Sequence, residues 1–507
     1  MVCQLVYLSR CIPGRIRHAL EELPTTLDAT YARTLEEIDD QNWEYAHRLF
    51  QCVAAASRPL HVKELAEFLA FDFQAESTPT FLADWRPEDP ANEVLSICST
   101  LLVVVESRWR FPVVQFAHFS VKEYLTSTRL AKAKDTISRF HVSMTPAHTI
   151  VAQACLGVLL HLDENITRVR LKDFPLADYA AEHWMGHARI ENVSPNLQDG
   201  MKRLFSPCKN HLSVWVWIYD PEVPWRRRIR SERPAKARAT PLHYAVVCNM
   251  HDIATFLIVE HSQDVNARGF ENEETPLQVS LRWGHVETAR VLLKHGADIE
   301  VRDDVDANLL ELAARTGQVE FAQVVLEHGA DANSTDFLGC TPLYWASQAG
   351  ELGVARRLLS HGAVVTARCK DNQTPLHIAK EEEVVRLLLD HGADANALDI
   401  DNRTPLHRAS ELGRVGAARV LLENGADANA RDAKNATPLH LAINCVHEWY
   451  DDGESEYLRV VQLLLQYGSD IHARDDEDRT PFMRAIRKGY HEFVELLLEH
   501  GAEDHKV

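Results

Sequence analysis

Residues 404–429 read TPLHRASELGRVGAARVLLENGADAN, the clearest copy of a unit that recurs through the C-terminal half of the chain. Thr404 can accept hydrogen bonds from the first free N–H groups of a helix, and Pro405 suits the first helical position because it needs no N–H there. Gly413 lets the chain turn into a second helix, and Gly425 can end that helix in a left-handed conformation. Each unit is therefore a pair of short helices that must bury its apolar faces against neighbouring copies.

The copies recur at a nearly constant spacing when they are aligned on this threonine. The spacings are 35, 33, 33, 33, 30, 33 and 43 residues for positions Thr240, Thr275, Asn308, Thr341, Thr374, Thr404, Thr437 and Thr480. A period near 33 residues that opens with TPLH is typical of ankyrin repeats. The chain from about residue 239 onward therefore resembles the ankyrin-repeat family, which implies an α-solenoid. The third copy, NLLELA, and the fifth, which is three residues short, depart from the pattern but are expected to stack.

The composition indicates a globular chain of at least two domains. It has 507 residues, 46% of them hydrophobic. The longest mostly apolar run, 149–162, is shorter than the roughly 20 residues that cross a bilayer, so it predicts a buried helix. Residues 1–8 lack the basic start and cleavage site of a signal peptide, and we expect a cytoplasmic protein. The ten cysteines form no C-x-x-C pair, which gives no support to a zinc site or a disulfide framework.

The net charge of -20 lies entirely in the repeat half. Residues 1–250 carry 29 Lys and Arg against 29 Asp and Glu, whereas residues 251–507 carry 25 against 45. An acidic surface repels phosphate backbones and favours basic or polar protein partners. The alternative interpretation is that this charge only keeps the repeats soluble.

The N-terminal part has the pattern of a winged helix. Helical periodicity over residues 1–40 is broken at Pro24, and two further helices, 43–55 and 62–70, surround Pro59. Two short apolar strands, joined by SRWR, then predict a wing, over 101–105 and 113–116, followed by a helix over 121–125. The stretch HVKELAEFLA is the candidate recognition helix. It lacks the outward Arg, Asn and Gln of a helix that reads DNA, so we expect no nucleic-acid partner.

The same region is similar to the segment after the ATPase domain of fungal NACHT-type, NOD-like receptor proteins. The stretches LEELPTTLDATYARTLEEID, ASRPLHVKELAEFLA, SICSTLLVV and QFAHFSVKEYLTS carry the resemblance, and ADYAAEHWMGHAR resembles that family's helical spacer. The predicted organisation is mainly α: a helical segment (1–40), a winged-helix-like domain (41–130), a helical spacer (131–223), a basic linker (224–238) and about eight repeats (239–507). The chain contains no G-x-x-x-x-G-K-[ST] motif, so it lacks the phosphate-binding loop of such ATPases.

No catalytic motif is present, and we expect neither an enzyme nor a cofactor. Nine of the 26 histidines sit at repeat-consensus positions, and the acidic run 475–478 lacks the glycine and glutamate of a calcium loop. The basic linker PWRRRIRSERPAKAR is interpreted as exposed. It is either a nuclear-import signal or a patch that binds an anionic surface, or its arginines pair with the acidic repeats. The long spacing in the seventh copy predicts a mobile insertion that includes Trp449 and Tyr450.

Two functions remain on this evidence. The favoured one is a non-enzymatic protein-interaction scaffold or ligand-sensing half of a NACHT-ankyrin type receptor. The alternative is the C-terminal part of a signalling NTPase for non-self recognition, whose NACHT domain lies outside this chain.

The ankyrin resemblance implies that partners bind on the concave face, formed by the first helices and the hairpin fingers before each TPLH. Fingertips are usually polar, but copies four and six place large apolar groups there. We therefore predict a docking patch on copies four to six. Its anchors are Phe337 and Ile400, with Leu338 beside them, Trp345 as a floor or a core residue, and a polar rim of Lys370, Asp371, Gln373, Asp401 and Arg403.

Overall fold

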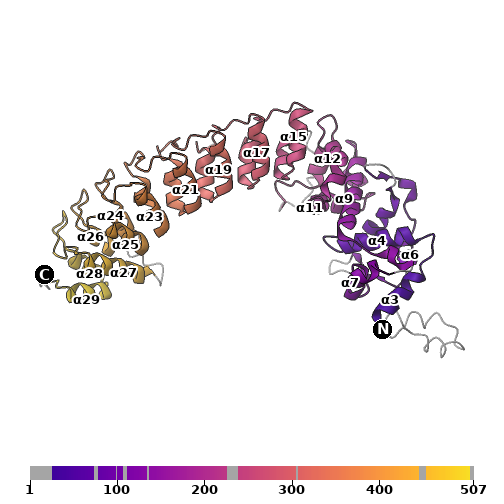
Figure 1. Ribbon diagram of the computed structural model, residues 1–507, viewed down its shortest axis with the longest axis horizontal. Helices are drawn as coiled ribbons and strands as arrows, with labels where there is room; N and C mark the ends of the chain where they lie inside the picture. Colours follow the sequence, from indigo (N-terminus) through magenta and orange to yellow (C-terminus); the bar gives the residue numbers. More distant parts are fainter. Residues whose placement is uncertain are drawn as a thin grey trace. The chain divides into compact units, whose positions relative to one another are not determined.

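The computed structural model describes residues 26–73, 78–98, 100–106, 111–133, 136–224, 238–303, 306–444 and 453–502. The chain forms two compact units, Met1–Gln263 and Asp264–Val507. Both are mainly helical, as predicted (Figure 1). The described residues include no helix long and apolar enough to cross a membrane. The basic linker, the insertion with Trp449 and Tyr450, and the helix predicted before Pro24 lie outside the described residues.

The first unit begins with a winged helix. Its sheet is antiparallel, in the order β1 (Leu60–His61), β5 (Pro112–Phe116), β4 (Leu102–Glu106), and the last two strands are the predicted wing. The helices are α3 (Leu27–Glu36), α4 (Trp43–Ala55), α5 (Val62–Glu67) with the 3-10 turn η2 (Phe68–Ala70), α6 (Pro90–Cys98), α7 (Phe119–Leu125) and α8 (Thr128–Ala131). A small second sheet pairs β2 (Phe71–Asp72) with β3 (Thr80–Phe81).

Helix α6 is a correction to the sequence analysis, which placed no helix between residue 70 and the wing. The recognition helix of a helix-turn-helix is its second helix, and α6 follows α5 and directly precedes the wing strand. Its sequence, PANEVLSIC, contains Glu93 and no basic residue. Helix α6 therefore has no Lys or Arg to contact a phosphate, whereas the candidate helix HVKELAEFLA has Lys63 alone.

Buried helices of the spacer form the core of the first unit. Helix α9 (Met144–His161) contains the apolar run that predicted a buried helix, and its interior face is fully buried. Trp215 on α13 (His211–Ile218) packs edge-on against Trp184 on α11 (Ala177–Ala188) and donates its indole N–H to Ala181 O at 2.9 Å. The remaining elements here are η3 (Ala83–Trp85), η4 (Thr136–Phe140), α10 (Arg168–Leu171), η5 (Ser194–Leu197) and α12 (Gln198–Phe205).

The first helix pair of the repeat series, α14 (Pro241–Val247) and α15 (His251–Val259), belongs to this first unit. Helix α15 packs on α12, where Gln198 donates to Asp252 at 3.3 Å and Lys202 Nζ lies 3.6 Å from Glu260. The compact unit therefore continues past residue 239, where the repeat series begins.

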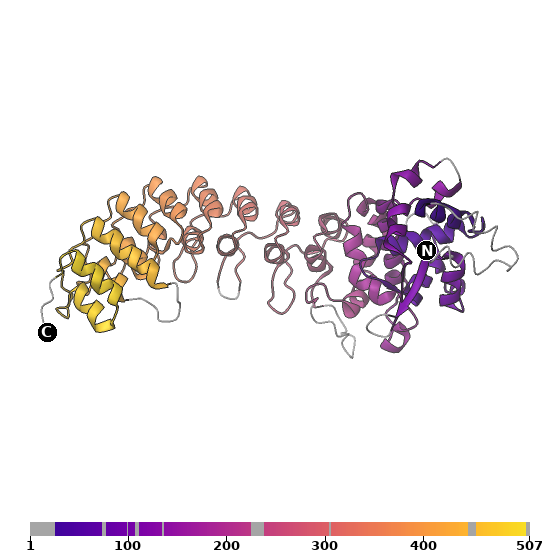
Figure 2. The same ribbon diagram turned by 90° about the horizontal axis from the view of Figure 1, so that it is seen from below.

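The second unit is a stack of seven described helix pairs, and Figure 2 shows the helices lying one behind another. The first helices are α16 (Pro276–Arg282), α18 (Leu309–Thr316), α20 (Pro342–Ala349), α22 (Pro375–Ile378), α24 (Pro405–Glu411), α26 (Pro438–Asn444) and α28 (Pro481–Lys488). The second helices are α17 (Val286–Lys294), α19 (Val319–Glu327), α21 (Leu352–Ser360), α23 (Glu382–Asp390), α25 (Val415–Glu423), α27 (Gly453–Gln466) and α29 (His491–Glu499). Both atypical copies, the third and the fifth, take their places in the stack.

In copies five, six and seven, the TPLH residues cap the first helix and join it to the next copy. Thr404 accepts a hydrogen bond from the His407 N–H, and His407 Nδ1 accepts one from the Thr404 N–H at 3.1 Å. His407 then donates from Nε2 to Ala436 O of the following copy at 3.1 Å. His377 and His440 make the same bonds to Arg403 O and Arg479 O. Gly413 and Gly425 have positive φ, as predicted.

Candidate protein-docking surface

The hairpins that connect successive copies form a row along one edge of the helix stack (Figure 1). We name five of them: finger 4 (336–340), finger 5 (369–373), finger 6 (399–403), finger 7 (432–436) and finger 8 (475–479). Fingers 4, 6, 7 and 8 begin with an aspartate whose Oδ1 accepts the N–H groups two and four residues later at 2.8–2.9 Å. This bond pair holds each hairpin closed.

Backbone hydrogen bonds join each finger to the next. The N–H of Lys370 donates to Leu338 O at 2.9 Å, and the N–H of Ile400 donates to Asp371 O at 3.0 Å. Finger 7 is joined to finger 6 in the same way, through Ala433 N–H and Asp401 O at 2.8 Å. The tips therefore form a continuous row.

The predicted anchors lie at the tips of this row. Phe337 is 54% exposed, Leu338 40% and Ile400 67%. Exposed Lys370 and Asp371 on finger 5 lie between them. The structure thus brings together an apolar tip, a charged tip and a second apolar tip.

Two of the predicted rim residues are partly used within the fold. Gln373 accepts a hydrogen bond from the Tyr344 hydroxyl at 2.8 Å. Arg403 is half-buried, with Nη1 3.2 Å from Glu411 and Nε 3.6 Å from Asp432 of finger 7. Asp401, by contrast, is exposed. The side chain of Arg403 consequently has less freedom to meet a partner than that of Asp401.

Trp345 is half-buried, so its exposure is intermediate between that of a patch floor and that of a core residue. Its indole N–H donates to Asp336 Oδ2 at 3.1 Å, and the Arg315 guanidinium carbon lies 3.7 Å from the ring centroid. Arg315 also pairs with buried Glu311 at 2.6 Å. Burial raises the pKa of Glu311 to about 7, although Arg315 opposes that shift. Glu311 and Arg315 were not expected from the sequence, because only the stacking of copies three and four places them against Trp345.

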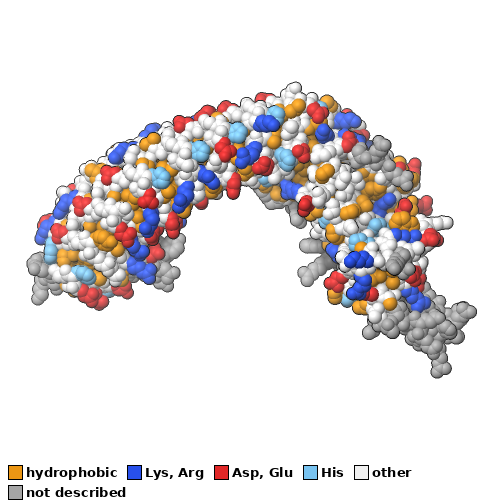
Figure 3. Space-filling view, in the orientation of Figure 1, with side chains coloured by type: hydrophobic (Ala, Val, Ile, Leu, Met, Phe, Trp, Pro, Cys, Tyr) orange, Lys and Arg blue, Asp and Glu red, His pale blue; other side chains and the backbone are white. Residues whose placement is uncertain are grey.

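Charged and apolar side chains are interspersed over the face of the molecule that Figure 3 shows, and histidines recur along the second helices. Two histidines that directly follow second helices, His328 and His391, hydrogen-bond the carbonyl four residues earlier, each at 2.8 Å. They are helix-ending residues. Among the described residues, no group of three His, Cys, Asp or Glu side chains could hold a metal ion.

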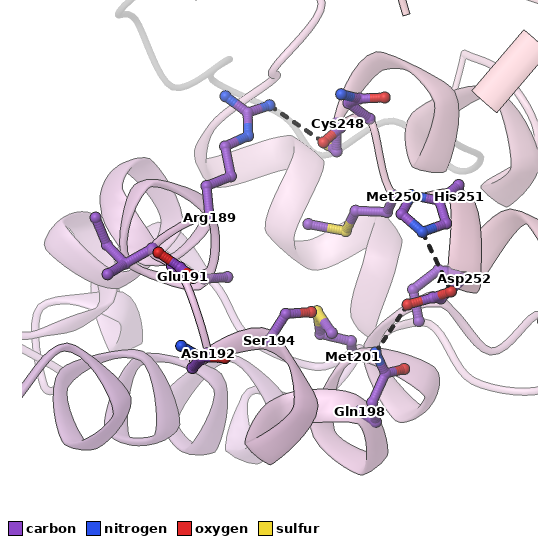
Figure 4. Close-up of a pocket in the computed structure, with 14 residues that line it drawn as sticks. Arg189, Glu191, Asn192, Ser194, Gln198, Met201, Cys248, Met250, His251 and Asp252 are labelled. Atoms are coloured by element: carbon purple, nitrogen blue, oxygen red, sulfur yellow. Dashed lines mark hydrogen bonds and ion pairs between the residues drawn. The ribbon is translucent and has the colours of Figure 1, made fainter. Parts of the chain in front are cut away.

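A pocket of about 290 Å³ opens in the first unit between the end of α11, α12 and the α14–α15 turn (Figure 4). Two side chains of the spacer, Arg189 and Gln198, reach the first helix pair across the opening. Arg189 donates to Cys248 O at 3.1 Å, and Asp252 accepts from Gln198 and lies 3.4 Å from His251. These bonds fasten the spacer to the first helix pair, and we assign the pocket no ligand.

Comparisons with known proteins agree with this architecture. Residues 228–506 match the description "Ankyrin repeats (3 copies)" in overlapping segments, and residues 36–138 match "GPI inositol-deacylase, winged helix domain". The chain is 30% identical over 295 residues to azaphilone pigments biosynthesis cluster protein L of Monascus ruber, which covers 55% of this chain and 61% of that protein. It is 27% identical over 140 residues to vegetative incompatibility protein HET-E-1 of Podospora anserina, 27% of this chain and 9% of that protein.

The ankyrin repeat domain of Bcl-3 is a similar solved structure, with 26% identity and a TM-score of 0.37 over 45% of this chain and all of that one. This chain matches only part of each relative: 61% of the length of the Monascus ruber protein and 9% of the length of HET-E-1. The N-terminal region has the winged helix, and resembles fungal NACHT-ankyrin proteins, as expected. Ankyrin repeats serve protein–protein interaction, and this chain belongs to the ankyrin-repeat family.

Proposed function

We propose that the chain is a non-enzymatic scaffold in the cytoplasm that binds a protein partner through the tips of fingers 4 to 6. The observation that carries this proposal is the exposure of Phe337 and Ile400 on turns whose own hydrogen bonds do not need them. Large apolar side chains that the fold leaves in water, next to charges, are typical of interaction surfaces. The resemblance to the ankyrin family supports the choice of fingers and first helices.

The partner that fits this row is a protein segment with apolar side chains flanked by basic residues. Phe337 and Ile400 would contact its apolar side chains, while Asp371 and Asp401 lie beside them as exposed carboxylates. The excess of acidic over basic residues in 251–507, 45 against 25, would attract basic flanks from a distance.

A pair of double variants tests the proposal. F337S/I400S removes the two anchors, and I486S/L498S removes two comparably exposed apolar residues, 51% and 45%, from the eighth copy as a control. Proteins captured by the immobilised wild type and lost only with F337S/I400S are then purified and titrated by calorimetry. We expect F337S/I400S to bind the partner at least about tenfold more weakly than the wild type does, and to bind it more weakly again in high salt. The melting temperatures of the variant and the wild type should agree within a few degrees.

Equal binding by F337S/I400S and the wild type would remove these tips from the binding surface. Unfolding of F337S/I400S alone would instead show that the two side chains are packing residues. Neither result is expected from side chains that are more than half exposed.

The alternative function is the C-terminal part of a NACHT-type signalling NTPase. The similarity to HET-E-1 supports it, and its test is to map the 5′ end of the transcript and ask whether the frame continues upstream into a phosphate-binding loop. For the scaffold alone, we propose that fluorescent ATP shows no binding at micromolar concentrations. Micromolar affinity in that titration would count against a non-enzymatic scaffold.

A further inference from the structure

Two cysteines meet where finger 4 contacts finger 5. Cys340, the last residue of finger 4, is buried, and Cys369, the first residue of finger 5, is half-buried. Burial and the neighbouring Cys369 side chain raise the pKa of the Cys340 thiol. The backbones are close as well: Lys370 N–H donates to Leu338 O at 2.9 Å, and a Cβ on Gly339 would lie 3.8 Å from the Cys369 Cα.

The pair formed by fingers 6 and 7 shows side chains at these two positions facing each other. The equivalents of Cys340 and Cys369, two copies along, are Arg403 and Asp432, whose Nε and Oδ2 atoms are 3.6 Å apart. Cys369 also stands where fingers 4, 6, 7 and 8 carry their capping aspartate. Because a thiol sulfur is a weak acceptor, Cys369 does not replace the carboxylate cap of the other fingers. Finger 5 still has its backbone bonds, such as the one from Cys369 N–H to Gln373 O at 3.0 Å.

We propose that Cys340 and Cys369 form a reversible disulfide that ties finger 4 to finger 5 and thereby regulates partner binding. The disulfide stands on the geometry alone, whereas its regulatory effect rests on the proposed function of the finger row. Both cysteines adjoin that row directly, because Cys340 follows the tip with Phe337 and Leu338, and Cys369 precedes Lys370.

The oxidant is a hydroperoxide, and the reaction balances as two steps. The Cys369 thiolate attacks the peroxide, the O–O bond breaks, and a sulfenic acid forms as hydroxide leaves and takes up a proton. The Cys340 sulfur then attacks the sulfenic sulfur and loses its proton, the S–O bond breaks, and water leaves. Two electrons pass from the sulfurs to the peroxide, and a dithiol reverses the reaction. Cys369 reacts first because it is the more exposed thiol, and burial raises the pKa of Cys340.

The disulfide matters for binding because finger 5 is the finger without a carboxylate cap. Its charged tip, Lys370 and Asp371, lies between the apolar tips of fingers 4 and 6. A covalent bond at its base would fix the distance from Phe337 to these charges. Oxidation would therefore change the affinity of the row without changing its composition.

The test oxidises the purified full chain with hydrogen peroxide, alkylates the remaining thiols and digests the product with trypsin. Cleavage after Arg368 and Lys370 would leave the Cys369–Lys370 dipeptide attached to residues 316–356, a mass that dithiothreitol removes. Exposed Cys208 reports that oxidant reached the protein. We expect this link to be the principal intramolecular one. Separate alkylation of both cysteines, or oxidation of Cys369 to a sulfinic acid without a link, would overturn the proposal.

Two variants borrowed from sister copies serve as controls that should fold. C340A takes the alanine found at Ala307 and Ala436, and C369D takes the aspartate of fingers 4, 6, 7 and 8. The partner used here is a protein that the wild type captures and F337S/I400S does not. Oxidation should change the wild type's affinity for this partner at least about threefold, and should leave the affinities of C340A and C369D unchanged. A link that forms without changing affinity would refute the regulatory role alone. Failure of F337S/I400S to lose any partner would refute the proposed function and leave the link measurable.

Discussion

Arg408 donates a hydrogen bond from Nη2 to Asp399 Oδ2 at 3.0 Å, which fastens finger 6 to the first helix of its own copy. Trp345 makes the same bond to Asp336, and Arg484 to Asp475. Burial alone would raise the pKa of Asp475, but the Arg479 N–H and the Arg484 guanidinium lower it to about 2. Asp475 is therefore held as a carboxylate that closes its hairpin on one side and binds the first helix on the other.

Replacing Arg408 with alanine should destabilise the second unit strongly. The Asp399 side chain is fully buried and would lose its charged partner, which costs about 3 kcal/mol even though two backbone N–H bonds remain. The control is R386A, which breaks an exposed pair with Glu382 at 2.8 Å and should cost less than about 1 kcal/mol. Urea unfolding of both variants measures the difference. Equal losses of stability in R408A and R386A would show that the buried Arg408–Asp399 bond contributes no more than the exposed Arg386–Glu382 pair.

Replacing Cys369 with aspartate should stabilise the second unit under reducing conditions. The new carboxylate can accept the N–H groups of Asp371 and Gln373, as Asp399 accepts those of Asp401 and Arg403, for a gain of about 1 kcal/mol. The matched control is C369A, which removes the thiol without adding an acceptor and should not stabilise. Thermal unfolding of the two variants decides the point: a gain shared by C369A would mean that the thiol itself, not the missing cap, weakens finger 5.

Two helical glycines of the first unit should respond to alanine in opposite directions. A Cβ on Gly157 in α9 would lie 2.7 Å from Phe71 Cε1 and 3.1 Å from Pro79 O, so G157A should cost about 1–3 kcal/mol through overpacking. A Cβ on Gly186 in α11 would meet no atom within 4 Å, so G186A should gain about 0.5–1 kcal/mol from helix propensity. Circular dichroism melts provide the measurement. Destabilisation by G186A would contradict the open surface seen there.

The helix pairs could be predicted from the sequence because their signals are local. The threonine, the proline and the two glycines of the unit from 404 to 429 act within a few residues of one another. Helix α6 was missed because its nine residues begin at Pro90, three residues after Pro87, and carry no clear period. The roles of Arg403 and Trp345 depended on Asp432 and Arg315, about thirty residues away, which only the stacking of copies brings near. The finger aspartates were predictable in principle, since each stands five residues before the repeat threonine.

Acid should weaken the repeat stack through its TPLH histidines. Burial lowers the pKa of His377, His407 and His440, the last to about 4, against 6.5 for an exposed histidine. The depressed pKa means that the unfolded chain binds protons more readily than the folded one. The stability is therefore fully present above about pH 6.5 and is lost as the pH falls towards about 4.

For His440 alone, lowering the pH from about 7 to about 5 should remove about 2 kcal/mol. The matched variant is H440Q, because Gln278 fills the equivalent position in the second copy and accepts the Thr275 N–H at 2.9 Å without titrating. H440Q should be less stable than the wild type at about pH 7, since it loses the bond to Arg479 O, and should lose less further stability at about pH 5. Urea unfolding at both pH values measures the two slopes. Identical slopes would show that His440 is not protonated on unfolding in this range.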